Sequence, residues 1–193
     1  NVDGTPRGET PHPILALDTV RHVGDPVALV VAGTLAQARD AAELVEVDYE
    51  ALPAVVGTAE AVREGMPRVW PGIASNLCFD VGAGSDAAQV ERALAGAAHV
   101  TRLELVNNRV VANPMEPRAA IADYDAATGL STLHTPTQGP HVILDQIADM
   151  ILKIGKANLR VLSGDVGGGF GMKIFLHAEQ PLVVWASRKL KRP

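Results

Sequence analysis

The chain has 193 residues, of which 47% are hydrophobic and 20% are charged, and its formal net charge at pH 7 is −5. This acidic balance argues against nucleic-acid binding, and no apolar run reaches the roughly 18 residues that a membrane span needs. A single cysteine, Cys78, excludes a disulfide scaffold and favours a reducing, cytoplasmic location. We expect Cys78 to be a buried structural thiol in a strand rather than a nucleophile.

The first part of the chain predicts a β-α-β unit. The apolar run at 26–32 has the length of a strand, and residues 45–53 alternate between apolar and polar side chains. Between them, Thr34 followed three positions later by Gln37 is the pattern of a capping box, which begins a helix. We therefore predict two strands, suited to parallel pairing, on either side of a helix. The mixed stretch at 57–76, with its glycines and prolines, predicts a domain boundary.

The second part of the chain predicts further strands and helices. Strands are expected at 76–81 and 99–106, with a glycine turn and a helix between them. The remaining predicted elements are two strands around a turn at Asp125–Gly129, a helix over 139–154, a strand over 158–164 and a helix over 177–190. These patterns indicate an α/β (α+β) fold, and we divide the chain into domains at 1–72 and 73–193.

Helical spacing also predicts which side chains of the last two helices face the core. The predicted faces are Ile143, Ile147 and Met150 or Ile151 in the first helix, and Ala178, Leu182, Trp185 and Ala186 in the second. Pro181 falls in the first turn of the second helix, where proline is tolerated.

The segment SGDVGGGFGMKIF, residues 163–175, joins the last predicted strand to the last predicted helix. Glycine weakens regular elements by roughly 0.5–1 kcal/mol relative to alanine, so this run indicates a loop whose backbone must approach something closely. The phosphate-binding P-loop does not fit, because Met172 separates Gly171 from Lys173 and no hydroxyl residue follows the lysine. The dinucleotide fingerprint Gly-x-Gly-x-x-Gly does not fit either, because its third glycine is missing.

A second glycine pattern, at Gly82–Ala87, matches Gly-x-Gly-x-x-Ala and follows a predicted strand. It also fits a plain turn in which Asp86 is the N-cap of the next helix and Gln89 completes a capping box. We favour the turn, because no clear second parallel strand with an acidic end follows. A stand-alone dinucleotide-binding protein is the alternative function that this segment would support.

Other polar residues form no recognisable catalytic or metal motif. The six histidines are scattered without His-Glu-x-x-His spacing, and we expect His134 and His141 to be polar surface or core partners rather than ligands. Glu116 lies between prolines, where we predict a role in turn geometry or an ion pair with Arg118.

Two loops at predicted strand ends offer groups that suit a ligand. TPTQGPH, residues 135–141, places Gln138 just before a helix, and the glycine loop has the same strand-to-helix setting. Such loops often meet at one edge of a sheet, where ligands of α/β proteins bind. Gln138 offers an amide, the glycines let backbone N–H groups approach, and Phe170 supplies an apolar wall. We predict a cradle for a bulky anionic cofactor.

Four segments of the chain, including the two candidate loops, carry a family resemblance. RHVGDPVALVVAGTLAQARDAAELVEVDYEALPAVV is similar to the α/β hammerhead domain of the molybdenum hydroxylases, the xanthine dehydrogenase and aldehyde oxidase family. ANPMEPRAAIADYD, TPTQGPH and DVGGGFGMK resemble the start of that family's molybdopterin-binding region, in the family's order. The resemblance runs from about His22 to Pro193. It implies a hammerhead domain over 1–72 and the first segment of a molybdopterin-binding domain over 73–193.

The resemblance also implies a cofactor and site residues. A molybdenum–molybdopterin cofactor, in a dinucleotide form, would be contacted by Gln138 and by the loop residues Gly168, Gly169, Phe170 and Gly171. Gln138 would hydrogen-bond to an oxo ligand, and no residue of the chain would ligate the metal directly. In that family, a glutamate base activates a metal-bound hydroxide that attacks an electrophilic carbon. Electrons then leave through [2Fe-2S] clusters, often to FAD.

Two differences from the family's pattern affect which substrate and which catalytic residues we expect for this chain. The purine-oxidising members place a substrate-binding glutamate after the lysine of this loop, where this chain has Ile174, so an aldehyde-like or heteroaromatic substrate is expected rather than xanthine. The base glutamate lies near the C-terminus of the family's much longer large subunits, so we expect no catalytic residue within these 193 residues.

Two interpretations of the function follow. We expect part of a molybdenum hydroxylase that is inactive alone and works with the remainder of the large subunit, an iron–sulfur subunit, an FAD subunit and a small-molecule substrate. The alternative is a non-catalytic split subunit or remnant that acts as a structural docking module for the cofactor-carrying or iron–sulfur chains.

Overall fold

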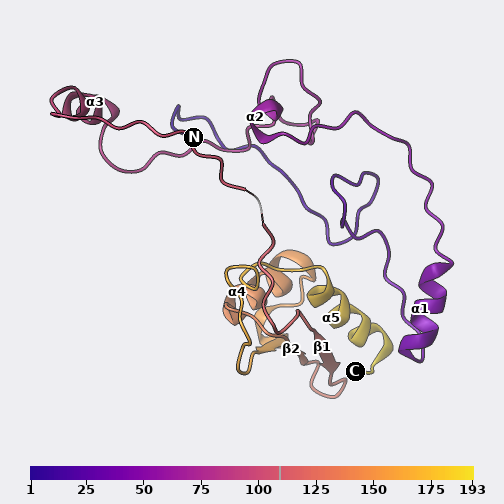
Figure 1. Ribbon diagram of the computed structural model, residues 1–193. Coiled ribbons are helices and arrows are strands. Elements are labelled where there is room, and N and C mark those ends of the chain that lie inside the picture. Colours follow the sequence, from indigo (N-terminus) through magenta and orange to yellow (C-terminus); the bar gives the residue numbers. More distant parts are fainter. Residues whose placement is uncertain (109) are drawn as a thin grey trace. The chain divides into compact units, whose positions relative to one another are not determined.

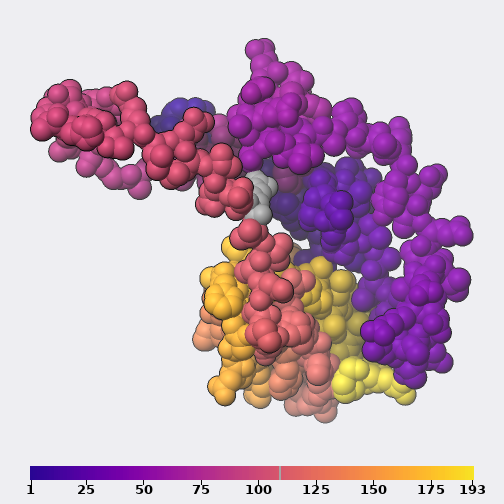
Figure 2. All heavy atoms as spheres, in the orientation of Figure 1, coloured from indigo at the N-terminus to yellow at the C-terminus, as the bar shows by residue number. Residues whose placement is uncertain are grey.

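The computed structural model describes residues 1–108 and 110–193, which form two compact units. One unit consists of residues 1–12 and 48–108, and the other of residues 13–47 and 110–193. The second unit contains the sheet and the glycine loop, and Figure 2 shows its later residues as closely packed atoms in salmon, orange and yellow.

The sheet has three strands among the described residues: β1 (Ile121–Tyr124), β2 (Ser131–His134) and β3 (Leu159–Leu162). Their order is β1-β2-β3, with β1 antiparallel and β3 parallel to β2. Figure 1 labels β1 and β2. All three strands were predicted from the sequence. The parallel pairing places the ends of β2 and β3 at one edge of the sheet, from which the two candidate loops leave.

Asp125 organises the tight turn between β1 and β2. Its carboxylate accepts hydrogen bonds from the N–H of Ala127 and the hydroxyl of Thr128, and its carbonyl accepts one from the N–H of Gly129. Gly129 adopts a φ of 75°, which glycine reaches without steric cost. The predicted turn at Asp125–Gly129 is therefore confirmed together with its chemical basis.

One face of the sheet is buried and the other is exposed. Ala122 pairs with Leu133, and Ser131 pairs with Leu159, so these four buried residues lie on the same face. The alternate residues of the strands, such as His134, are exposed. The core against the buried face consists of Ala122, Leu133, Ile143, Ile147, Ala148, Leu159 and Val184. The period of two in the strand sequences sets this division.

The predicted helix over 139–154 is α4 (Pro140–Asp145) followed by the π-helix η1 (Gln146–Ile151). Ile143 and Ile147 are fully buried, as predicted. The prediction that Met150 or Ile151 continues this face was wrong, because both are at least partly exposed and Ala148 is buried instead. A π-turn bonds residue i to i+5, as between the N–H of Leu152 and the carbonyl of Ile147, and this wider turn rotates later side chains off the expected face.

The chain returns to the sheet through a 3₁₀ turn, η2 (Lys156–Asn158), and ends in α5 (Glu179–Leu190). Helix α5 contacts β1 and β2, and Pro181 lies in its first turn as predicted. The predicted buried face of Ala178, Leu182, Trp185 and Ala186 was wrong. The buried residues are Gln180, Pro181, Val184 and Ser187. Gln180 faces inward because its side chain is hydrogen-bonded on both ends, to Thr135 and to the N–H of His177.

Helix α1 (Leu35–Glu43) begins where the sequence predicted. The side chain of Thr34 accepts a hydrogen bond of 3.2 Å from the N–H of Gln37. The predicted strands at 26–32 and 45–53 are not formed, although apolar residues of both segments face α1 across a shared cavity. A strand requires a hydrogen-bonded neighbour, and these two segments do not pair with each other.

In the other unit, α2 (Thr58–Ala61) and α3 (Ala87–Ala95) are the helices among the described residues. Asp86 is the N-cap of α3, as predicted, but its side chain makes no capping hydrogen bond. The strands predicted at 76–81 and 99–106 are absent for the same lack of a paired neighbour. Instead, the carbonyl of Cys78 accepts from the N–H of Gly8. Cys78 is half-buried, with its Sγ 3.6 Å from the hydroxyl of Thr10.

None of the helices formed by the described residues combines the length and apolar character needed to cross a membrane.

Candidate functional site

The glycine loop turns through the left-handed region of backbone space at three positions. Gly168 has a φ of 97°, Phe170 of 50° and Gly171 of 85°. Glycine adopts such angles freely, whereas a bulky residue such as phenylalanine is strained there. Phe170 is nevertheless 78% exposed. Strain of this kind is concentrated at functional sites, where neighbouring contacts hold the backbone in place.

Gln138 lies directly against this loop. Its side-chain oxygen accepts a hydrogen bond of 3.1 Å from the N–H of Gly171. A Cβ atom on Gly169 would lie 2.5 Å from the Cδ atom of Gln138, so only glycine permits this approach. Gln138 is exposed, and its amide nitrogen donates to no other described residue. The structure thus brings together the two loops that the sequence singled out.

Glu116 and Lys173 form a second attachment of the loop. The Nζ atom of Lys173 lies 2.7 Å from a carboxylate oxygen of Glu116 and 2.9 Å from its carbonyl oxygen. The same carboxylate oxygen accepts a hydrogen bond of 2.8 Å from the N–H of Gly167. The side chain of Lys173 is fully buried, and that of Glu116 is 36% exposed. The prediction of an ion pair between Glu116 and Arg118 was wrong, because Arg118 binds Glu179 at 2.6 Å.

Thr137 links the two loops through their backbones. The carbonyl of Lys173 accepts hydrogen bonds from the hydroxyl of Thr137 and from the N–H of Gln138, at 2.9 and 3.1 Å. The N–H of Thr137 in turn donates to the hydroxyl of Ser163 at the end of β3. The hydroxyl of Thr135 donates to the carbonyl of Ala119. Three separate segments, 114–119, 135–139 and 163–173, are therefore held in one arrangement.

Sequence reasoning missed Lys173 and Glu116 as a pair. The signal was present, because Lys173 is a single charged residue between Met172 and an apolar run, Ile174-Phe175-Leu176. A buried lysine requires a partner of opposite charge. The partner lies 57 residues earlier in the chain, and sequence spacing gives no measure of that contact.

We expect Glu116 to make the stability of the fold decrease on acidification. The hydrogen bond from Lys173, followed by that from the N–H of Gly167, lowers the pKa of Glu116 from its ordinary value of 4.5. Such a carboxylate stabilises the fold above pH 4.5, and this contribution is lost as the pH falls through the lower, folded-state pKa. On acidification below about pH 4.5, the midpoint temperature of thermal unfolding should therefore decrease more in the natural protein than in Glu116→Gln. Identical pH profiles would contradict this expectation.

The loop presents hydrogen-bond donors that have no partner within the described residues. The N–H groups of Gly168, Gly169 and Phe170 donate to no described residue, and Gly169 is buried. Buried N–H groups are rarely left without an acceptor. Together with the amide nitrogen of Gln138, they form a neutral set of donors that suits an anionic, oxygen-rich group. The described residues contain no cluster of three or more His, Cys, Asp or Glu side chains that could hold a metal ion.

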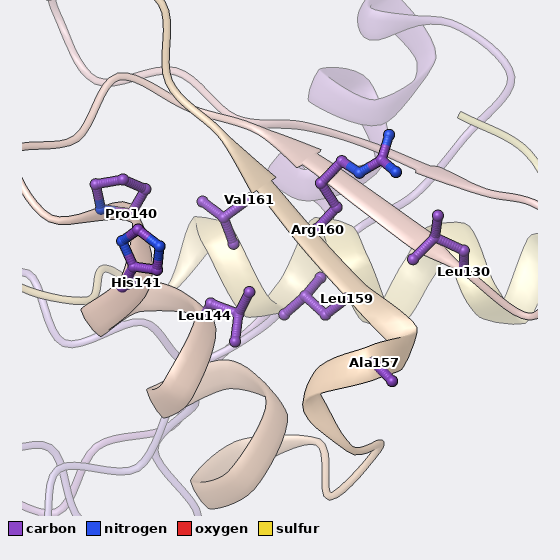
Figure 3. Close-up of a pocket in the computed structure, with 8 residues that line it drawn as sticks. All are labelled: Leu130, Pro140, His141, Leu144, Ala157, Leu159, Arg160 and Val161. Atoms are coloured by element: carbon purple, nitrogen blue, oxygen red, sulfur yellow. The ribbon is translucent and has the colours of Figure 1, made fainter.

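The two histidines that the sequence singled out, His134 and His141, lie outside this arrangement. His134 is exposed at the end of β2, and His141 is exposed in α4. His141 lines a separate cavity between α4 and β3 together with Arg160, and the other lining side chains are mainly apolar (Figure 3). No residue predicted to contact a cofactor lines that cavity.

Comparisons with known proteins show which families the two parts of the chain match. Residues 71–193 match the model of the molybdopterin cofactor-binding domain. Residues 2–53 match the a/b hammerhead domain of aldehyde oxidase and xanthine dehydrogenase. Both matches confirm the resemblance found in the sequence.

Relatives with known names are similar along nearly the whole chain. The large subunit of nicotine 6-hydroxylase from Paenarthrobacter nicotinovorans is 36% identical over 94% of this chain and 22% of its own length. The carbon monoxide dehydrogenase large chain of Hydrogenophaga pseudoflava is 30% identical over 93% of this chain and 24% of its own length. The chain therefore spans about a quarter of the length of these relatives.

A solved structure agrees with these matches. Quinoline 2-oxidoreductase from Pseudomonas putida 86 superposes with a TM-score of 0.84 and 40% sequence identity, over 96% of this chain and 23% of that chain. Since the family model covers residues 71–193, which include both candidate loops, the chain belongs to the family of molybdopterin cofactor-binding domains.

Proposed function

We propose that this chain supplies one wall of the cofactor site in a molybdenum hydroxylase that acts on a heteroaromatic or aldehyde-like carbon. The proposal is supported mainly by the joined pair of loops, in which Gln138 accepts a hydrogen bond from Gly171 and its amide nitrogen has no partner among the described residues. When bound, the molybdenum–molybdopterin cofactor supplies two-electron redox chemistry that inserts oxygen from water into a carbon–hydrogen bond.

Five residues would contact the cofactor: Gln138, Gly168, Gly169, Phe170 and Gly171. The amide nitrogen of Gln138 and the N–H groups of Gly168, Gly169 and Phe170 would donate hydrogen bonds to its electron-rich atoms. The exposed ring of Phe170 would shield the site from water. Gly171 has open space where a Cβ would lie, so the loop leaves room for a group beside it.

A heteroaromatic substrate receives additional support from the relatives. The names of two of them refer to nicotine and quinoline, both of which contain nitrogen heteroaromatic rings. Ile174, partly exposed just after the loop, is an apolar neighbour suited to such a ring. We further propose that residues 1–72 form the hammerhead domain and 73–193 the first part of the cofactor domain. The base, the [2Fe-2S] clusters and the FAD would lie outside these residues. The assembled enzyme would be located in the cytoplasm.

An isotope experiment on the whole enzyme tests this function. The purified enzyme is analysed for molybdenum and pterin and is then supplied with quinoline or an aromatic aldehyde, together with an artificial electron acceptor, in ¹⁸O-labelled water. We expect molybdenum in the protein and one ¹⁸O atom in the hydroxylated product. Unlabelled product, or protein that lacks molybdenum after expression with molybdate, would contradict the proposal.

Gln138→Ala tests the part played by the amide. Because the side chain is exposed, we expect the fold to remain intact and turnover to fall by about 10²-fold, as after loss of a preorganised donor. Gln89→Ala, at an exposed position of α3, is the matched control and should leave turnover unchanged. Turnover and circular dichroism of both variants decide the matter, and unchanged turnover in Gln138→Ala would remove the residue from the site.

A further inference from the structure

Lys173 is a deeply buried charged residue, with 1% of its surface exposed. Its ammonium group is bound by the carboxylate and the carbonyl oxygen of Glu116. Burying a lysine is costly, and an apolar side chain of similar volume often stabilises a protein as well or better. A purely stabilising role therefore explains poorly why a charge lies here.

The ion pair closes the glycine loop into a ring. Gly167, at the start of the loop, donates its N–H to Glu116, and its carbonyl accepts the N–H of Glu116 at 3.3 Å. Lys173, at the end of the loop, binds the same carboxylate oxygen. Glu116 thus connects both ends of the segment 167–173, which carries the strained Phe170 and the unpartnered N–H groups.

The same residue also fixes Gln138. The carbonyl of Lys173 holds the N–H of Gln138 and the hydroxyl of Thr137. A displacement of Lys173 would therefore move both the loop and the amide that rests on it. We infer that the Glu116–Lys173 pair is a positioning device, which sets the glycine loop and Gln138 relative to each other for the cofactor. The reference to the cofactor rests on the proposed function, whereas the ordering of the loop does not.

A second ion pair in the same region provides a matched control. Arg118 and Glu179 are joined at 2.6 Å and likewise connect the 114–119 segment to the chain after the loop. Both side chains are partly exposed, at 43% and 37%, and neither bonds to Gly167 or Gln138. Arg118 also donates to the Sδ atom of Met172 in the loop at 3.7 Å, so the control changes only Glu179. Glu179→Gln removes the charge of this ion pair and leaves the contacts of the loop in place.

The experiment compares Lys173→Met, Glu116→Gln, their double variant and the control Glu179→Gln in the whole enzyme. Hydrogen exchange of residues 166–173 is measured by mass spectrometry with and without the cofactor, and molybdenum content is measured in parallel. We expect exchange in this segment to accelerate at least about tenfold in Lys173→Met, while β1 and β2 keep their protection. Molybdenum content should fall in the same variant, and the control should resemble the natural enzyme in both measurements.

The double variant shows whether the two residues act as one unit. If they do, Lys173→Met/Glu116→Gln should exchange no faster than Lys173→Met alone, because the interaction is already lost. Exchange in Lys173→Met equal to that in the control, or strictly additive effects, would overturn the inference. If Lys173→Met fails to fold, exchange in Glu116→Gln is compared with that in the control instead. Glutamine keeps the size of glutamate and its ability to form hydrogen bonds. If the natural enzyme holds no molybdenum but exchange is still faster in Lys173→Met, the proposed function is refuted. The inference that the ion pair orders the loop is then retained.

Discussion

Gly167→Ala is expected to lower the free energy of unfolding by about 1–3 kcal/mol, the cost of inserting a methyl group into a packed contact. A Cβ atom on Gly167 would lie 2.6 Å from the Cβ atom of Glu116. A Cβ atom is fixed to the backbone and cannot swing away, so one of the two segments must shift. The shift would break the hydrogen bonds that residues 116 and 167 exchange, and Lys173 would lose the geometry of its partner.

Gly164→Ala is the matched control for this prediction. Gly164 lies in the same connection, but a Cβ atom there would meet nothing within 4 Å, and its φ is not in the left-handed region. Alanine should therefore be neutral or slightly stabilising, because it reduces the freedom of the unfolded chain. Urea unfolding of both variants provides the measurement. Equal midpoints for Gly167→Ala and Gly164→Ala would show that the contact with Glu116 does not constrain position 167.

The parts of the fold that the sequence predicted well depend on local chemistry. The turn at Asp125 and the cap at Thr34 are set by groups only a few residues apart. The α/β (α+β) class followed from these elements, and it agrees with the observed mixture of helices and a small mixed sheet. Short-range hydrogen bonds are visible in a sequence because spacing alone determines them.

The parts that failed depend on partners that spacing does not reveal. The runs at 26–32 and 99–106 have strand composition, yet a strand exists only when a neighbour pairs with it. The inward face of α5 was misassigned because apolarity was used as the guide. The satisfied amide of Gln180 is buried there, whereas Trp185 is 46% exposed. A wider π-turn rotated the end of the helix after Ile147 in a way that a period of 3.6 residues cannot describe.

For the candidate site, the sequence indicated both loops but gave only part of the reason for the glycines. We interpreted them as room for a cofactor, and that remains a proposal. For three of these glycines, the structure also shows a reason within the chain itself. Gly167 and Gly169 make room for the side chains of Glu116 and Gln138, and Gly168 adopts a left-handed φ. The glycines thus fit the loop to its own chain as well as to any bound group.

Gly169→Val should reduce activity at least as much as Gln138→Ala while sparing most of the fold. A Cβ atom at position 169 would meet the Cγ, Cδ and Oε1 atoms of Gln138, which belong to the outer part of a flexible, exposed side chain. That side chain can swing away at little cost to the fold, in contrast to the fixed Cβ atom of Glu116 at position 167. Its hydrogen bond with the N–H of Gly171 would then be lost, and the branched side chain would occupy its place.

The expected result is therefore a separation of stability from function along a single loop. In the whole enzyme, Gly169→Val should lower turnover by about 10²-fold or more and reduce molybdenum content, with an unfolding midpoint close to that of the natural protein. Gly167→Ala should instead lower the midpoint clearly. Full turnover and full molybdenum content in Gly169→Val would show that Gln138 need not rest on Gly171. In that case the close packing at Gly169 would be a feature of folding alone, and the glycine loop would lose its place in the proposed site.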